Sequence, residues 1–229
     1  MTIGIIGAMD SEVKLYLEAL QNKEKTTLAS FDFYKGTLND KEVVIVKSGI
    51  GKVNSAACAQ ILINKFSPEK IIFTGVAGSL NPELDVKGIV ISTESIQHDV
   101  DATAFGYKRG EIPQMNTRGF KSCPDLTAKA YESSKNLDLE VMKGIILTGD
   151  QFIANKELTK TLREEFSGDC TDMESAAVAQ VCHLNNIPHV IIRSMSDKAD
   201  GSANVNFEEF EIEAANNSFK IVNELLKKL

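Results

Sequence analysis

The segment that most constrains the fold of this chain is residues 169–200, DCTDMESAAVAQVCHLNNIPHVIIRSMSDKAD. The run from His189 to Ile192 is mostly apolar and does not alternate, which predicts a strand buried on both faces of a sheet. The small residues that begin at Ala176 predict a helix before this strand, and the turn residues around Pro188 separate the two. The segment therefore predicts an α/β unit whose sheet is covered on both sides.

Two acidic residues lie at the ends of these predicted elements. Glu174 comes just before the small-residue run, so we expect it in the first turn of the helix, where the helix dipole favours a negative charge. Asp197 follows the buried strand, and ligands in open α/β sheets bind beyond the carboxyl ends of strands. Taken alone, a residue such as Glu174 is more often an ordinary charge at a helix N-terminus, and Asp197 could equally be a helix cap. The pair is a candidate for acid-base chemistry only together with further residues.

The rest of the chain alternates short apolar strands with helical patterns, and its length suits one domain, residues 1–229. We expect the other strands at residues 2–7, 31–38, 42–47, 71–74, 88–95 and 141–147. We expect helices after residue 10 (capped by Asp10 or Ser11, with Glu12 in the first turn), at 53–66, 125–137 and 156–166, and from about residue 207. This alternation predicts an α/β fold of three layers, α/β/α, with a central mixed sheet. Residues 99–124 are expected to be irregular, and long irregular segments are often functional.

Composition excludes several kinds of partner. The formal net charge of -7 argues against nucleic acid, because binding to a polyanion depends on clustered Lys and Arg. No apolar run approaches the roughly 20 residues of a membrane span, so no membrane partner is expected. The four cysteines have no CxxC spacing and no secretory signal pattern precedes them, which predicts reduced thiols and a cytoplasmic protein. The stretch from His98 to Asp101 is the only faintly metal-like pattern, and a polar strand end explains it better. No metal site is predicted.

Common cofactor motifs are missing. Residues 4–9, GIIGAM, do not match the GxGxxG of dinucleotide-binding folds, and Gly51-Lys52 is not followed by the Ser or Thr of a phosphate loop. Arginine is scarce, and the first one in the chain is Arg109. A phosphate co-substrate is usually held by a guanidinium group, so phosphate as a reactant is disfavoured.

Seven short motifs occur in order along the chain: GIIGAM-x-SE, SGIGKVNSA, TGVAGSL, HDVDATAFGY, TGDQFI, DMES and SMSD. Together they resemble the 5'-methylthioadenosine/S-adenosylhomocysteine nucleosidases, a family with the nucleoside phosphorylase fold, over residues 3–207. The resemblance implies hydrolysis of the N-ribosidic bond of 5'-methylthioadenosine, S-adenosylhomocysteine and 5'-deoxyadenosine. It also implies a homodimer that takes part in methionine salvage and amino-acid biosynthesis and uses no metal or organic cofactor.

The resemblance implies roles for individual residues. Glu12 is expected to be the base that activates water, Asp197 the acid that protonates adenine N7, and Glu174 the residue that holds the ribose hydroxyls. The chemistry agrees, because cleavage through an oxocarbenium-like state needs a proton for the leaving group and a water on the opposite face. The other expected substrate contacts are Met9, Ile50 and Phe207 around the 5' group, Phe152 and the Ile153 backbone at adenine, and Gly78, Met173 and Ser196. Three residues are expected to reach a neighbouring subunit's pocket: Phe105, Tyr107 and Pro113.

The sequence departs from the family at three positions. Val76 stands where many members have Ser, Ser79 where they have Gly, and Ala102 where a larger aliphatic residue is common. Preference among the thionucleosides therefore stays open. Two other interpretations stay open as well: a nucleoside phosphorylase of the same fold, and a protein that binds the nucleoside without turning it over.

Overall fold

The structure, a computed structural model, describes residues 1–115, 117–200 and 203–229, with backbone only for residues 204–206 and 208. The strands are β1 (Thr2–Gly7), β2 (Gln21–Leu28), β3 (Phe31–Leu38), β4 (Lys41–Lys47), β5 (Lys70–Ser79), β6 (Ile89–Gln97), β7 (Gly119–Lys121), β8 (Val141–Thr148), β9 (Cys170–Asp172) and β10 (His189–Asp197). The helices are α1 (Asp10–Ala19), α2 (Lys52–Phe66), α3 (Pro124–Ser134), α4 (Lys156–Phe166), α5 (Ser175–Leu184) and α6 (Ala203–Leu226), with a 3₁₀ turn at Thr103–Phe105.

The strands form one mixed sheet, in agreement with the expected fold class. Its order is β10-β6-β8-β9-β5-β1-β4-β3-β2, and β7 pairs with β6. Strands β4, β1, β5 and β10 are parallel to one another, whereas β2 and β3 run antiparallel at the edge. Because β10 also pairs with β5, the strands β5, β9, β8, β6 and β10 close on one another as a ring.

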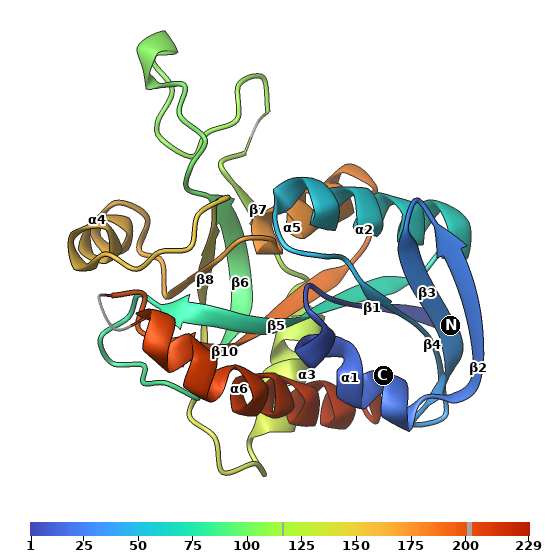
Figure 1. The fold of residues 1–229 in the computed structure, drawn as a ribbon. Coiled ribbons are helices and arrows are strands. Elements are labelled where there is room, and N and C mark those ends of the chain that lie inside the picture. The colour runs from blue at the N-terminus through green and yellow to red at the C-terminus, as the bar shows by residue number, and fades with distance from the viewer. Residues whose placement is uncertain (116, 201–202) are drawn as a thin grey trace.

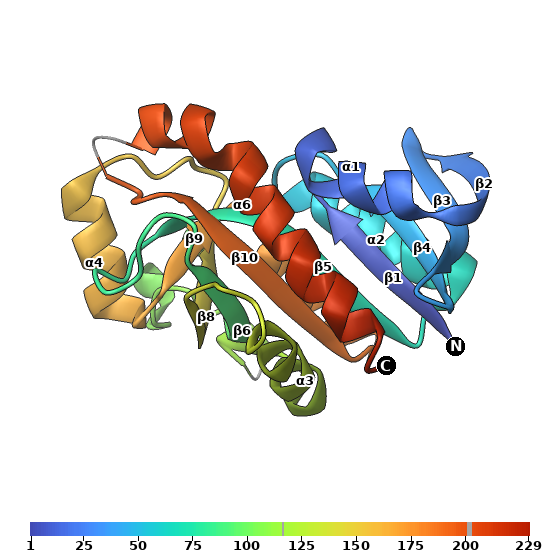
Figure 2. The ribbon, with the colours of Figure 1, turned by 90° about the horizontal axis from the view of Figure 1, so that it is seen from below.

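Helices cover both faces of the sheet, and the central strands contribute side chains to both cores. In β5, Ile71 and Phe73 belong to the core that includes α2 and α5, whereas Ile72 belongs to the core that includes α1, α3 and α6. Strand β10 divides in the same way, with Ile191 on the first side and Val190 on the other. Figure 2 shows α1 and α6 lying across one face of these strands. Burial on both faces explains why these strands are continuous apolar runs.

The parallel strands bring distant parts of the sequence to one edge of the sheet. Strands β1, β5 and β10 run side by side, with Ile6 paired to Phe73 and Asp197 to Gly78. Their carboxyl ends are followed by α1 and α6 and lie near α2 and α5 (Figure 1). Ala8, Met9 and Glu12 therefore meet residues 76–78 and 196–197 around one pocket, although they come from opposite ends of the sequence.

Several expected boundaries were wrong. Strand β2 was not predicted, because its residues QNKEKTTL are polar and mostly exposed and it is held by pairing with β3. Residues 99–124 are not wholly irregular, since β7 pairs with β6 and α3 begins at Pro124. Strands β5 and β10 extend past their apolar runs through Ser79 and Asp197, and α6 begins at residue 203 instead of 207.

The prediction of a single domain over residues 1–229 stays a prediction. Among the described residues, no helix combines the length and the apolar character needed to cross a membrane.

Candidate active site

A pocket of about 490 Å³ opens at the carboxyl ends of β1, β5 and β10. It is lined by Ala8, Met9, Glu12, Ile50, Val76, Ala77, Gly78, Phe152, Thr171, Asp172, Met173, Glu174, Ser196, Asp197 and Phe207. Ten residues that the sequence marked as site candidates are in this set, and they come from seven separate parts of the chain. Glu12 and Asp197, from opposite ends of the sequence, share one pocket.

Glu12 lies in the first turn of α1, as expected, and its side chain caps the helix itself. Its Oε2 accepts hydrogen bonds from the backbone N–H groups of Ala8 at 2.5 Å and Met9 at 3.0 Å, and its Oε1 accepts from Val76 N–H at 2.9 Å. The expectation that Asp10 or Ser11 would cap α1 was wrong, because the N-cap residue is Met9. Burial raises the pKa of Glu12 above its usual value, although Arg193 and the three N–H groups act in the opposite direction. Glu12 is thus held in place by backbone donors on both its oxygens.

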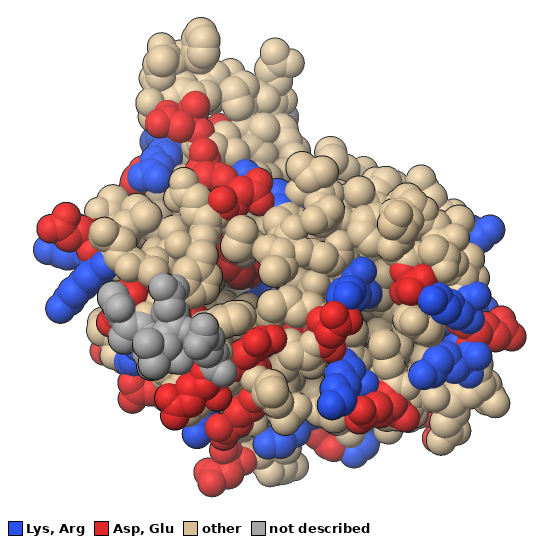
Figure 3. All heavy atoms as spheres, viewed as in Figure 1, with Lys and Arg blue, Asp and Glu red and all other residues tan. Residues whose placement is uncertain are grey.

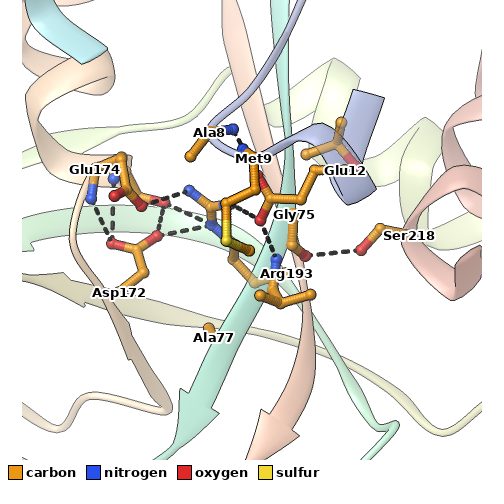
Figure 4. A network of polar contacts seen from close by, with 12 residues as sticks. Ala8, Met9, Glu12, Gly75, Ala77, Asp172, Glu174, Arg193 and Ser218 are labelled. Carbon is orange, nitrogen blue, oxygen red and sulfur yellow. Dashed lines mark hydrogen bonds and ion pairs between the residues drawn. The ribbon is translucent and has the colours of Figure 1, made fainter. Parts of the chain in front are cut away.

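Arg193 is the main functional candidate that the sequence reasoning missed. Its side chain is fully buried in β10 with the guanidinium 4.1 Å from the centre of the Phe73 ring, and its Nε donates to Asp172 Oδ2 at 2.7 Å. Its Nη1 lies 3.8 Å from Glu12 Oε1 and its Nη2 lies 3.8 Å from Glu174 Oε2 (Figure 4). Neither Nη atom has a hydrogen-bond partner among the described residues. A charged residue inside an apolar strand needs buried partners, and that signal could have identified it.

Glu174 lies one position earlier than expected, at the N-cap of α5 and not in its first turn. The backbone N–H groups at the start of α5, which have no partner within the helix, donate to Asp172 instead. Asp172 Oδ1 accepts from Glu174 N at 3.2 Å and from Ser175 N at 3.1 Å. The Glu174 side chain is therefore free to turn toward the pocket, and its Oε1 accepts from Gly51 N–H at 2.8 Å. Burial and the nearby charge of Asp172 raise the pKa of Glu174 to about 7, against the effect of Arg193.

Asp197 is the last residue of β10 and its side chain is buried beside β5. Its Oδ1 accepts from Ala199 N–H at 2.7 Å, and its Oδ2 accepts from the Ser196 hydroxyl at 2.9 Å. Burial raises its pKa above the usual value, despite these two hydrogen bonds. No basic side chain among the described residues forms an ion pair with it, which distinguishes it from the carboxylates around Arg193.

Glycine at position 78 allows Asp197 to take this place. A Cβ added at Gly78 would lie 2.7 Å from Asp197 Oδ1. The register of the β5–β10 pair also shifts between Met195 and Asp197, so that Asp197 is opposite Gly78. This irregularity aims the last carboxylate of β10 at the pocket.

The mouth of the pocket is apolar. The rings of Phe152 and Phe207 meet edge to face with centroids 5.8 Å apart, and Ile50 is half exposed beside them. Val76 packs with Met9, Phe207 and two alanines of α6, Ala214 and Ala215. A ligand in this pocket would therefore meet carboxylates at one end and aromatic and aliphatic side chains at the other.

Four predicted site residues do not line the pocket of this chain. The Ile153 side chain is buried in a cluster with Leu80, Ile96 and residues of α4, away from the pocket lining. Phe105, Tyr107 and Pro113 lie on the segment that projects from the body of the molecule (Figure 1). Phe105 is 83% exposed. Within the described residues, no group of three His, Cys, Asp or Glu side chains is arranged to hold a metal, and Asp99 of the faintly metal-like stretch pairs with Lys52.

Comparisons with known proteins agree on one family. The sequence profile of the phosphorylase superfamily matches residues 2–227. A 5'-methylthioadenosine/S-adenosylhomocysteine nucleosidase of Anoxybacillus flavithermus is 44% identical over 231 aligned positions, which cover 100% of this chain and 99% of the relative.

Solved structures are similar over the whole chain as well. The Neisseria meningitidis 5'-methylthioadenosine/S-adenosylhomocysteine nucleosidase in complex with methylthio-immucillin-A is 40% identical with a TM-score of 0.96, covering 100% of this chain and 99% of its own. A futalosine hydrolase of Helicobacter pylori is 35% identical with a TM-score of 0.95, covering 100% and 98%. The predicted nucleoside phosphorylase-like fold is confirmed.

Proposed function

This chain belongs to the phosphorylase superfamily and, within it, to the 5'-methylthioadenosine/S-adenosylhomocysteine nucleosidases, and from that premise we propose how its pocket hydrolyses the N-ribosidic bond of these two nucleosides. The observation that carries the proposal is the contrast between its carboxylates. Asp197 is buried without a cation among the described residues, whereas Glu12 faces Arg193. Two carboxyl groups whose surroundings differ in this way suit the separate roles of acid and base.

Asp197 is the proton donor in this proposal. Its raised pKa keeps a proton on the carboxyl group closer to neutral pH, and that proton passes to N7 of the departing adenine. The electrons of the broken C1'–N9 bond then stay with a neutral base. Ser196 and the Ala199 N–H orient the carboxyl group.

Glu12 and Arg193 act on the water. The two Nη groups of Arg193 have no hydrogen-bond partner among the described residues and lie between Glu12 and Glu174, each 3.8 Å from a carboxylate oxygen, so they can donate to a bound water. The water oxygen attacks C1' and its proton passes to Glu12. Glu174 accepts hydrogen bonds from the ribose hydroxyls, and its negative charge stabilises the cationic sugar of the transition state.

The same cluster disfavours phosphorolysis. A phosphate ion in place of the water would face Glu12, Asp172 and Glu174, with the one guanidinium already shared among them. The other arginines are engaged elsewhere: Arg109 with Glu165, Arg118 with a backbone carbonyl, and Arg163 with Asp169. This is a physical reason for water, rather than phosphate, as the nucleophile.

Incubation of purified protein with 5'-methylthioadenosine in phosphate-free buffer tests the proposal. We expect free adenine and methylthioribose, at a rate that added phosphate does not raise. Adenine that forms only with phosphate would identify a phosphorylase, and tight binding without turnover would identify a nucleoside-binding protein.

A second candidate substrate is favoured by the half-exposed mouth of the pocket. Ile50, which is expected beside the 5' group, is 52% exposed there, so a larger 5' substituent than methylthio has room to extend outward. A futalosine hydrolase is among the similar structures, which makes futalosine the natural compound to compare with 5'-methylthioadenosine in the same assay.

We also propose that the protein acts as a homodimer in the cytoplasm, in methionine salvage and amino-acid biosynthesis. The surface over α2 and α5 carries few charged side chains (Figure 3), and the exposed Val53 and Leu184 belong to these helices. Phe105 projects without covering this chain's own pocket. A second subunit would cover these apolar side chains and receive Phe105, Tyr107 and Pro113.

A further inference from the structure

Three loops meet beside the pocket at a triangle of polar contacts formed by Lys52, Asp99 and Asp150. Lys52 Nζ donates to Asp99 Oδ1 at 2.7 Å, and the backbone N–H of Asp150 donates to Asp99 Oδ2 at 3.0 Å. The backbone N–H of Lys52 donates in turn to Asp150 Oδ1 at 2.8 Å. These residues begin α2, follow β6 and follow β8, so the triangle joins segments whose contacting residues are 47, 51 and 98 positions apart in the sequence.

The triangle is partly shielded from solvent. The side chains of Lys52 and Asp99 are each 20% exposed, whereas most other ion pairs of the protein are more exposed. Burial tends to raise the pKa of Asp99, but the ammonium of Lys52 and the Asp150 N–H outweigh it and hold the pKa below its usual value. Asp99 is therefore a carboxylate at neutral pH, with one oxygen for each partner.

Both halves of the proposed substrate site are attached to this triangle. Gly51, the residue before Lys52, donates its N–H to Glu174 Oε1 at 2.8 Å, which is the proposed ribose contact. Phe152, two residues after Asp150, lines the mouth where the base is expected. Two successive backbone N–H groups at the start of α2 thus bind one carboxylate on each side of the site: Gly51 N–H binds Glu174 on the ribose side, and Lys52 N–H binds Asp150 on the base side.

We propose that Asp99 is a positioning residue, which fixes the loop of Phe152 against the start of α2 and so sets the distance between the base contact and Glu174. The inference rests on the proposed function for the identity of the base. Asp99 does not line the pocket, so it acts through Asp150 and Lys52. Without Asp99, the 150–152 loop would lose one of the two hydrogen bonds that Asp150 makes in the triangle, and the base contact would be less ordered before binding.

Affinity for adenine is the most selective measurement, because adenine reports on the base contact alone. Calorimetric titration with adenine would compare the wild type with Asp99→Ala, Asp99→Asn and Lys52→Met. We expect Asp99→Ala to raise the Kd for adenine and the KM for 5'-methylthioadenosine about tenfold, the usual worth of a charge-assisted hydrogen bond. We expect Asp99→Asn and Lys52→Met to have smaller effects, because each leaves one contact in place.

The matched control is Asp125→Asn, which removes an ion pair with Lys129 that lies within α3. We expect it to change neither adenine affinity nor KM. We also expect kcat of the Asp99 variants to stay within about threefold of the wild type, since Glu12 and Asp197 are untouched.

Unchanged adenine affinity in Asp99→Asn and Lys52→Met would overturn the inference, and so would a loss of kcat without a change in Kd. If Asp99→Ala does not fold, these two milder variants decide the matter. If the wild type binds adenine but does not release it from 5'-methylthioadenosine, the proposed function fails, while the adenine titrations still test Asp99.

Discussion

At the scale of single residues, the carboxyl groups of the pocket differ in the side chains that surround them. Glu12, Asp172 and Glu174 surround one guanidinium, and Asp197 is buried apart from it. A buried arginine with several carboxylates satisfies its own charge and leaves the pocket with a surplus of negative charge. That surplus suits a cationic sugar in the transition state and opposes an anionic nucleophile.

Glu174 links this chemistry to stability. Its pKa rises from an ordinary value of 4.5 to about 7 on folding, so between these pH values the folded protein keeps a proton that the unfolded chain has lost. Stability due to this group therefore falls as pH rises from 4.5 to 7. Glutamine cannot lose that proton. We expect Glu174→Gln to gain stability relative to the wild type between pH 5 and pH 8, by up to about 3 kcal/mol.

Urea unfolding of both proteins at pH 5 and pH 8 measures this difference. Glu164→Gln, on the exposed side of α4, is the control and should show the same change with pH as the wild type. If Glu174→Gln instead loses stability relative to the wild type toward pH 8, the pKa of Glu174 is not raised in the folded protein.

At the scale of elements, β5 makes room for Arg193 and Glu12 because it has a glycine at position 75. A Cβ at Gly75 would lie 2.1 Å from Arg193 Nη1 and 2.2 Å from Glu12 Oε1. We expect Gly75→Ala to separate the two groups, to lower turnover by at least tenfold and to destabilise the fold by about 1–3 kcal/mol. Turnover assays and urea unfolding would measure both effects.

Gly36→Ala in β3 is the comparison, because its added Cβ would lie 2.4 Å from the Gln21 carbonyl oxygen and Gly36 does not line the pocket. It should cost stability through the same kind of steric contact and leave the pocket intact. Equal loss of turnover in the two variants would show that steric contact at Gly75 is not the reason.

The elements also show what the sequence could predict. Continuous apolar runs such as that of β10 predicted the buried strands, because burial on both faces leaves a local signal. Strand β2 left none, since its polar residues are ordered only by pairing with β3. Short motifs identified Glu12, Glu174 and Asp197 as candidates. Arg193 and Asp172 were not identified, because their importance comes from contacts between β10 and the end of β9 that no local pattern contains.

At the scale of the whole molecule, the proposed homodimer makes each site depend on two chains. In this proposal Phe105 completes the partner's pocket. In a mixed dimer of a Glu12→Gln subunit and a Phe105→Ala subunit, the pocket of the Phe105→Ala subunit therefore has its own Glu12 and receives Phe105 from the other subunit, so one of the two sites is native. We expect activity to rise above the mean of the two separate variants after they are unfolded and refolded together. Activity that stays at that mean would place Phe105 outside the partner's site.

The central claim is that Asp197 supplies the leaving-group proton and Glu12 activates the water. A nitrophenyl glycoside of methylthioribose tests it most directly, because nitrophenolate departs without protonation. We expect Asp197→Asn to lose ~10²- to 10⁴-fold in turnover of 5'-methylthioadenosine but to cleave the nitrophenyl compound at nearly the wild-type rate, whereas Glu12→Gln should fail with both. Equal impairment of Asp197→Asn on the two substrates would contradict the account.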